Sequence, residues 1–461
     1  MALLLAGGVA IVGCELTVDE HPTRVDETHQ QSHMGSLGNS LTAGFINGGI
    51  EMKGQLASFP NLLSQIMTGR AMQMPWVAAP GLGSESGMTP LFVDEDGDLT
   101  RAPLTVGPIE LALNLTYPLP YDNLGIPGVT TDHILNVMFS AEIGNATVDL
   151  ILRNAALPGG GTPVAQMARI QPDVLTAWSG NNEILGGALS GSPQSVDPMS
   201  PGYVVPFADF QADFLELCDR IAEIAPEMVA VGNIPPITAI PYTQFLVPRP
   251  LGFYGPRFVM EEDILSDSHA DSVQLVLLTA PVGDCSDCFF TSCQFNEFDC
   301  DTIPDWATLT FGEVELLETA VADYNAFIAT EVADRGWAMV DINAAFLALP
   351  TTPAGVPVNT YFPWLIDPLS GIGTKNANSA FSLDGVHPSE KGHAVLANAF
   401  LEAFNDHYGT AYEMVDVESI ENVSGFELAP VGEKIEGGRV RITEEGRLGL
   451  RAVADMMAVR R

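Results

Sequence analysis

Two residues near the carboxyl end of the chain have the types and spacing of an acid–base pair. Asp384 and His387 lie three residues apart, directly before a segment with a helical pattern. At this spacing one turn can carry an imidazole together with the carboxylate that fixes its tautomer. Pro388 is expected to be the first residue of the following helix. Without a nucleophile in view, the pair is better explained as two surface side chains.

A candidate nucleophile lies near the other end of the chain. Ser40 stands in the glycine-flanked turn 38–44, after a short, weak strand pattern that is expected to end at Leu37. A hydroxyl nucleophile needs exposure, a nearby base and a backbone N–H aimed at the developing oxyanion. A glycine-rich turn at the carboxyl end of a parallel strand can supply all three. Taken alone, such a segment is usually only a turn.

Two further segments supply candidate amide donors. Segment 123–128 reads as a strand that runs into a loop, where Gly128 would expose its N–H. Segment 180–183 follows a predicted strand directly, and could present the Asn182 amide to the same crevice. Each of these motifs is weak. The presence of all four segments, in this order, favours a serine hydrolase.

The elements that must position these residues alternate between strands and helices, which predicts a parallel sheet with helices on both faces. Strands are expected over 173–178, 228–231, 273–278 and 338–342. Helices are expected around 60–67 with Ser58 as N-cap, from about Phe210 to Pro226, and over 313–334 and 390–407. Insertions at about 70–121 and 234–310 interrupt this order and are expected around the cleft.

The four segments resemble blocks I, II, III and V of the SGNH hydrolases, also called GDSL lipases and esterases. The resemblance spans about residues 35 to 405, and the stretches 54–63, 323–327 and 340–343 are similar to bacterial lipoprotein members of this family. It implies an α/β fold, a three-layer α/β/α sandwich with a central parallel sheet of SGNH or flavodoxin-like type, enlarged by the loop insertions.

The resemblance also implies a role for each signature residue. The family's Ser, Gly, Asn and His fall on Ser40, Gly128, Asn182 and His387, and its triad aspartate falls on Asp384. His387 would deprotonate Ser40, which attacks an ester carbonyl, and Asp384 would hold the imidazole. The oxyanion would be bound by the N–H groups of Ser40 and Gly128 and by the Asn182 side chain. No metal or cofactor is implied.

The sequence departs from the family's pattern at two places. Asn39 stands where the family usually has Asp before the serine, and Glu183 stands where block III usually has Asp. The Asn39 side chain can still accept hydrogen bonds from the turn, so the nucleophile is expected to keep its position. The exchange at Glu183 concerns the geometry of a loop outside the triad.

Charge restricts the partners of the protein. The chain has 461 residues with 19 basic and 58 acidic side chains, a formal net charge of −39. The phosphate backbone of a nucleic acid would be repelled, so no nucleic-acid partner is expected. An acidic surface with only four lysines suits a salty medium, because salt screens the self-repulsion. We therefore expect a halophilic or marine source and a stability that rises with salt.

The amino-terminal segment predicts export. Residues 1–13 are apolar and too short to span a bilayer, and Ile11-Val12-Gly13-Cys14 resembles a lipobox, which would make Cys14 the lipidated residue. An ordinary signal peptide is the alternative. The expected organisation is a signal segment 1–14, a polar tether 15–34, a hydrolase domain 35–410 and a C-terminal appendage 411–461. The protein would reach the outer membrane or cell surface, touching the membrane only through its lipid, or else be periplasmic or extracellular.

Cysteines cluster in one insertion. Four of them lie within 16 residues, and in an exported protein they are expected to form two disulfides: Cys285, Cys288, Cys293 and Cys300. The sequence leaves three pairings open, and a zinc or iron–sulfur site is the alternative. Cys218, by contrast, lies in an apolar helical pattern and is expected to be a buried thiol.

Three functions remain in competition. The first is an esterase or lipase acting on small-molecule or lipid carboxylic esters, and the second is a deacetylase of acylated glycans with the same chemistry. The third is a surface lipoprotein that uses the fold only for binding. A binding protein has no need of Ser40, Gly128, Asn182, Asp384 and His387 together, which favours an enzyme.

Overall fold

The computed structural model describes most of the expected hydrolase domain. The described residues are 33–118, 120–155, 160–243, 259–260, 273–279, 302–303, 305–349, 364–366, 373–375, 378–427 and 443–458. Cys14, the signal segment 1–14, nearly all of the tether 15–34, and the cysteines Cys285, Cys288, Cys293 and Cys300 lie outside this part of the chain. Within it, no helix has both the length and the apolar composition that crossing a membrane requires.

The described residues form a central sheet of five parallel strands. Its spatial order is β7 (Asn123–Gly125), β1 (Met34–Gly38), β8 (Val174–Trp178), β9 (Met228–Gly232) and β14 (Ala338–Val340). By position in the sequence this is the order 2-1-3-4-5 of doubly wound sheets, in which the direction of winding reverses beside the first strand. Ligands bind such sheets at the carboxyl ends of the strands flanking the reversal, here β1 and β8.

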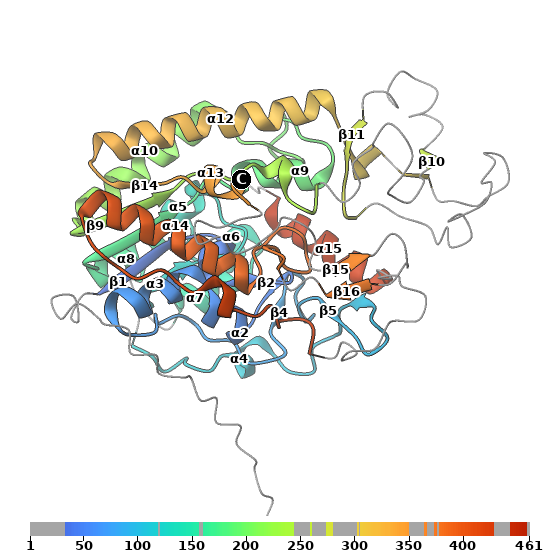
Figure 1. Ribbon diagram of the computed structural model, residues 1–461, viewed down its shortest axis with the longest axis horizontal. Coiled ribbons are helices and arrows are strands. Elements are labelled where there is room, and N and C mark those ends of the chain that lie inside the picture. Colours follow the sequence, from blue (N-terminus) through green and yellow to red (C-terminus); the bar gives the residue numbers. More distant parts are fainter. Residues whose placement is uncertain are drawn as a thin grey trace, which may run out of the picture.

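Helices cover both faces, so the predicted three-layer α/β/α fold with a parallel sheet is confirmed (Figure 1). One face packs against α3 (Phe59–Thr68) and α14 (Glu390–Tyr408). The other face packs against α5 (Thr131–Asn136), α8 (Pro163–Ile170), α10 (Phe207–Ile224) and α12 (Phe311–Asp334). Alternate side chains of β8 enter the two cores, since Val174 and Trp178 lie in one and Leu175 and Ala177 in the other. Burial on both faces explains the continuous apolar strands.

Shorter elements surround this core. The remaining helices of the described residues are α1 (Ser40–Ala43), α2 (Met52–Ala57), α4 (Pro108–Leu111), α6 (Ser140–Ile143), α7 (Thr147–Leu152), α9 (Asn182–Ser190), α13 (Ile342–Leu347) and α15 (Glu444–Met457), with 3-10 turns η1 (Ile237–Ala239), η3 (Asp305–Ala307) and η4 (Val417–Ser419). Small sheets pair β2 (Phe45–Ile46), β3 (Gly49–Ile50) and β4 (Leu82–Gly83); β5 (Phe92–Val93) with β6 (Leu99–Thr100); β10 (Val259–Met260) with β12 (Thr302–Ile303); β11 (Val273–Val276) with β13 (Thr308–Thr310); and β15 (Trp364–Ile366) with β16 (Gly373–Lys375).

Several local predictions need correction. The strand expected over 338–342 ends at Val340, because the Asp341 side chain accepts the Ala344 N–H and starts helix α13. Pro388 precedes helix α14 rather than opening it, since Ser389 caps the helix by accepting the Gly392 N–H.

Two other elements also differ from expectation. Ser58 does occupy the N-cap position of α3, but its hydroxyl donates backward to the Gln55 carbonyl instead of capping. The apolar run 273–278 gives the strand β11, which pairs antiparallel with β13 outside the central sheet.

Cys218 is buried in α10 as expected, and burial raises the pKa of its thiol to about 12.

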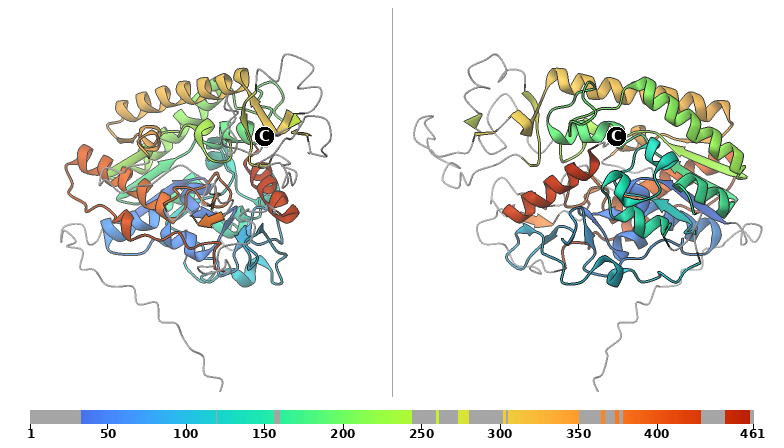
Figure 2. Two further views of the ribbon diagram at one scale, coloured as in Figure 1. Left: turned by 45° about the vertical axis from the view of Figure 1, so that its right-hand side comes forward. Right: turned by 180° about the vertical axis from the view of Figure 1, so that it is seen from behind.

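The C-terminal helix α15 folds back onto the body. Its apolar side buries Leu450, Val453 and Met457, and the helix contacts α9 and β6. Figure 2 shows this helix, in red, beside the rest of the domain. At its start Glu445 pairs with Arg101, and further along the Arg451 guanidinium lies 4.6 Å from the centre of the Trp306 ring.

Candidate active site

The turn after β1 presents Ser40 at the carboxyl end of the sheet. Asn39 caps the short helix α1, and its side-chain oxygen accepts the Leu41 N–H across 3.1 Å. Asn39 therefore makes the local hydrogen bond that an Asp would make. A Cβ at Gly38 would lie 2.7 Å from the Trp178 carbonyl of β8, so only glycine lets the chain turn this close to its neighbour. Ser40 becomes the first residue of α1, whose N–H has no partner within the helix.

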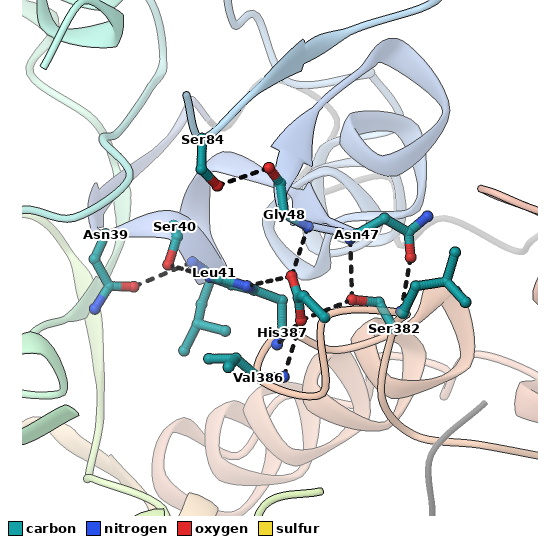
Figure 3. Close-up of polar contacts among 11 residues, drawn as sticks. Asn39, Ser40, Leu41, Asn47, Gly48, Ser84, Ser382, Val386 and His387 are labelled. Atoms are coloured by element: carbon teal, nitrogen blue, oxygen red, sulfur yellow. Dashed lines mark hydrogen bonds and ion pairs between the residues drawn. The ribbon is translucent and has the colours of Figure 1, made fainter. Parts of the chain in front are cut away.

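Ser40, His387 and Asp384 lie in one hydrogen-bonded row. Figure 3 labels Ser40 and His387 of this row. The Ser40 Oγ is 2.9 Å from His387 Nε2, and His387 Nδ1 is 2.8 Å from Asp384 Oδ2. An ionised carboxylate only accepts hydrogen bonds, so Nδ1 carries the proton and Nε2 of the neutral ring accepts from the serine hydroxyl. The three residues are 2%, 1% and 0% exposed. This is the arrangement in which an imidazole can take a proton from a hydroxyl.

The Asp384 carboxylate accepts four further hydrogen bonds. Backbone N–H groups donate from Gly48 at 2.6 Å, His387 at 2.8 Å and Val386 at 2.9 Å, and the Ser382 hydroxyl donates at 3.2 Å. Burial alone would raise the pKa of Asp384, but the His387 imidazole and the backbone N–H groups of His387 and Val386 lower it below its ordinary value. The group therefore stays ionised and fixed in orientation, as the tautomer of His387 requires.

A hairpin turn that the sequence analysis did not single out holds this loop. Asn47 and Gly48 join β2 to β3 with φ of 58° and 69°, the left-handed pair of a type I′ turn. The Asn47 N–H donates to the Ser382 hydroxyl, and its side-chain oxygen accepts the Leu383 N–H. An Asn-Gly pair between short β-type runs is a strong hairpin signal and would have revealed the turn. Its contact with residues 335 positions away would have stayed hidden.

Asn182 and the loop of Gly128 meet beside the triad. Asn182 is the first residue of α9, and its amide nitrogen donates to the Val129 carbonyl across 2.7 Å. This bond ties the loop after β7 to the carboxyl end of β8, next to Ser40. Gly128 has φ of 76°, and a Cβ there would lie 2.5 Å from the Met456 carbonyl of α15, so no other residue fits.

Glu183 stands where block III of the SGNH hydrolases usually has Asp, and its longer side chain makes a contact with a neighbouring helix. Its Oε1 accepts the Thr131 N–H at the start of α5 across 2.6 Å, so the longer side chain joins α9 to α5. Burial raises the pKa of this carboxyl. Glu183 thus braces the helices around the site.

Asn181 is a candidate that sequence reasoning missed. It lies between Gly180 and Asn182 at the end of β8, is 4% exposed, and lines the hollow beside Ser40. Neither polar atom of its side chain has a hydrogen-bond partner. A buried amide without a hydrogen-bond partner lowers the stability of the fold. Such a residue is commonly retained at a site where a bound ligand completes its hydrogen bonds. No pattern within the sequence distinguishes this residue from an ordinary turn asparagine.

Ser40 and His387 both line this hollow. Its polar lining consists of Asn39, Ser40, Asn181, Asn182 and His387, and the rest of the described lining is apolar or glycine. His393, six residues beyond His387, stays outside it. The His393 ring is fully buried in α14, accepts the Phe59 N–H at Nδ1, and has a pKa lowered to about 3 by burial.

Comparison with known proteins gives only distant likeness. No protein-family model matches the chain, and no curated protein matches it. A catalytic mutant of an acetylxylan esterase from Geobacillus stearothermophilus is 12% identical, with a TM-score of 0.33 over 84% of this chain and 97% of that one. A gut microbial diltiazem-metabolizing enzyme is 15% identical, with a TM-score of 0.32 over 80% of this chain and 47% of that one. The chemistry inferred below follows from the geometry of the site.

Proposed function

We propose that this protein is a serine hydrolase that cleaves carboxylic esters through an acyl-enzyme on Ser40. The observation that carries this proposal is the row from Ser40 Oγ through His387 to Asp384, with contacts of 2.9 and 2.8 Å. Three side chains from opposite ends of the chain are buried here in the order and orientation that proton transfer from a hydroxyl requires. A binding surface has no use for that order.

The mechanism combines these contacts with the oxyanion donors that the resemblance to SGNH hydrolases implies. His387 Nε2 removes the Ser40 proton as Oγ attacks the ester carbonyl, and the charge on the imidazole is balanced by Asp384. The tetrahedral oxyanion is bound by the N–H groups of Ser40 and Gly128 and by the Asn182 amide. His387 then protonates the leaving alcohol, and the acyl group stays on Ser40. A water molecule, deprotonated by His387, attacks the acyl-enzyme and releases the acid.

A fluorophosphonate probe tests the proposal. The probe is expected to add to Ser40, with the adduct located by mass spectrometry, and to release fluoride. Ser40→Ala should not react, whereas Ser36→Ala, which removes another buried hydroxyl in the strand before it, should still be labelled. Absence of labelling in the folded parent protein would favour the binding lipoprotein. A substrate panel that includes acetylated glycans separates the esterase from the deacetylase.

We further propose that the protein is exported and lipid-anchored through Cys14. Support comes from the lipobox-like segment and the polar residues after it. Metabolic labelling with a clickable fatty acid in a bacterial host should mark the parent chain and not Cys14→Ser. Equal labelling of both would contradict the anchor, and release of an unlabelled mature chain would indicate an ordinary signal peptide.

A further inference from the structure

The walls of the hollow beside Ser40 are almost entirely hydrocarbon. They come from several separate elements, and include Ile237 of η1, Phe346 of α13, Leu185 of α9 and Val395 of α14. All of its polar side chains belong to the turn after β1, the turn after β8, and His387. Within the described lining there is no carboxylate, ammonium or guanidinium group. The reacting ester group therefore belongs at the polar side chains of the hollow. The other side chains of the lining suit an apolar part of the substrate.

Several of these wall residues are only partly buried. Leu41, Phe346, Leu349, Val395 and Leu396 keep intermediate exposure although they lie together in one concavity. Apolar side chains gathered in a hollow gain free energy when a ligand removes them from water. Because Ser40 belongs to the same lining, we expect the ligand that covers these walls to be attached to the group that reacts there.

A sugar fits this lining poorly. Its hydroxyls would lose water without gaining partners on hydrocarbon walls. The one tryptophan in the lining, Trp178, is 2% exposed and packs edge-on against Phe59 in the core, so it offers no stacking surface. An acetyl group would reach only the first wall residues.

We propose that the hollow binds an aliphatic chain, longer than acetyl, on the ester that Ser40 cleaves. This inference rests on the proposed serine hydrolase and adds its substrate class. The chain belongs either to the acyl group or to the alcohol, and the two sources differ in which ester series shows the dependence. Each methylene that becomes buried should raise kcat/KM by up to about fourfold until the hollow is full.

Two ester series test the proposal. One varies the acyl group from acetyl to dodecanoyl on a fixed alcohol, and the other varies a linear alcohol on a fixed acetyl group. One series should show kcat/KM rising with chain length to an optimum. Ala345→Phe, which fills the hollow from α13, should shift that optimum to shorter chains. The matched control Ala344→Phe changes an exposed alanine on the same helix and should not shift it.

The result separates this inference from the proposed function. If Ser40 reacts with the fluorophosphonate but the ester with the shortest chain is the best substrate in each of the two series, the chain-binding hollow is wrong and the hydrolase stands. An optimum that Ala345→Phe leaves in place would also overturn it. If Ser40 does not react at all, the proposed function fails first.

A second inference concerns helix α15, which touches three separate supports of the site. Its Val453 lies against Gly48, which donates to Asp384, and a Cβ on Gly48 would lie 2.9 Å from Val453 Cγ2. The Met456 carbonyl lies against Gly128, and the Met457 carbonyl against Gly186 of α9, 2.8 Å from where a Cβ would stand. None of the described residues of α15 lines the hollow.

We infer that α15 positions the oxyanion donors and the Asp384 loop. These three glycines lie on a hairpin, a loop and a helix that are distant in sequence. Gly128 and Gly186 meet backbone carbonyls of α15, and Gly48 meets its Val453 side chain. A helix in this place fixes their mutual distances, on which stabilisation of the oxyanion depends. Its loss should lower kcat more than it raises KM, because binding of the aliphatic chain uses other elements.

Truncation after residue 442 gives the direct test. The shortened chain should lose at least tenfold in kcat, and a synthetic peptide of residues 443–461 added in trans should restore part of it. Gly186→Ala pushes the end of α15 away from α9 and should also lower kcat. Leu448→Ala, on the exposed side of α15, is the matched control. An undiminished kcat in a folded truncated chain overturns the inference. If that chain does not fold, an undiminished kcat in Gly186→Ala overturns it.

Discussion

The backbone N–H of Gly48 and the ring of His387 meet at one oxygen of Asp384. Gly48 donates to Oδ2 across 2.6 Å, and His387 Nδ1 lies 2.8 Å from the same atom. The carboxylate is therefore fixed from the amino-terminal part of the chain as well as by its own loop. Orientation of the imidazole depends on a hairpin more than 300 residues away in sequence.

Asn47→Gly tests this dependence. Glycine keeps the left-handed turn but removes the acceptor of the Leu383 N–H, which leaves a buried donor unpaired. We expect the free energy of unfolding to fall by about 1–3 kcal/mol and kcat to fall by about tenfold. Denaturant titration and steady-state kinetics measure the two effects. The control Ser84→Ala removes a hydrogen bond to the Gly48 carbonyl on the other side of the turn and should keep kcat. Equal loss in both variants would contradict a specific role.

Asp384→Asn should disable proton transfer while the fold persists. The amide can donate to Nδ1, which stabilises the wrong tautomer and leaves Nε2 protonated. A loss of kcat on the order of 10⁴ is expected, as in other triads of this type. Ester hydrolysis and the rate of fluorophosphonate labelling provide two independent readings. A variant within tenfold of the parent enzyme would show that Asp384 does not set the tautomer.

Asn181→Leu should separate stability from activity. The substitution removes two buried polar atoms that have no partner, in a side chain of similar size. The free energy of unfolding should rise by about 1–3 kcal/mol, whereas kcat/KM should drop because the substrate loses a hydrogen-bonding partner. Thermal unfolding and kinetics on one short-chain ester measure the two quantities. Unchanged kinetics would assign Asn181 a purely structural position.

His393 predicts a pH dependence of stability. The unfolded chain binds a proton on this ring below about pH 6.5, whereas the buried ring stays neutral down to about pH 3. Between these values the unfolded state holds more protons, so stability is lost as pH falls, by at most about 1.4 kcal/mol per pH unit from this group.

His393→Asn isolates that contribution, since the amide oxygen can replace Nδ1 as acceptor of the Phe59 N–H. Denaturant titrations between pH 4.5 and 6.5 should give a shallower slope for the variant. Asp384, whose pKa is lowered, keeps its contribution throughout this window, and Glu183 is common to both proteins. Identical slopes for the parent and the variant would mean that the His393 ring binds its proton equally in the folded and the unfolded chain.

Net charge predicts a response to salt. With a formal charge of −39, self-repulsion in the folded state should decrease as the Debye length shortens from about 10 Å at 0.1 M to about 3 Å at 1 M. The melting temperature should therefore rise with sodium chloride, and more than with sucrose at equal osmolality. A flat salt response would contradict the expectation of a halophilic protein.

The sequence predicted those features that depend on local pattern. Ser40, Asp384 and His387 could be found because their motifs are short, and the strand that leads into Gly180 because its apolar residues are consecutive. The structure indeed brings these three side chains together. Asn47 escaped notice because its importance lies in a contact with a distant loop. The contact between α15 and Gly128 could not be predicted for the same reason, since packing partners leave no periodic signal in the sequence. Ser58 holds the predicted N-cap position, but the local pattern does not reveal that its hydroxyl donates to the Gln55 carbonyl.

The separation of Ser40 from His387 by 347 positions has one more outcome. A single cut anywhere between them gives two pieces, each with only half of the proton-transfer pair. Neither piece can hydrolyse through this route until they reassociate. Activity in a mixture of such fragments would thus report their reassembly.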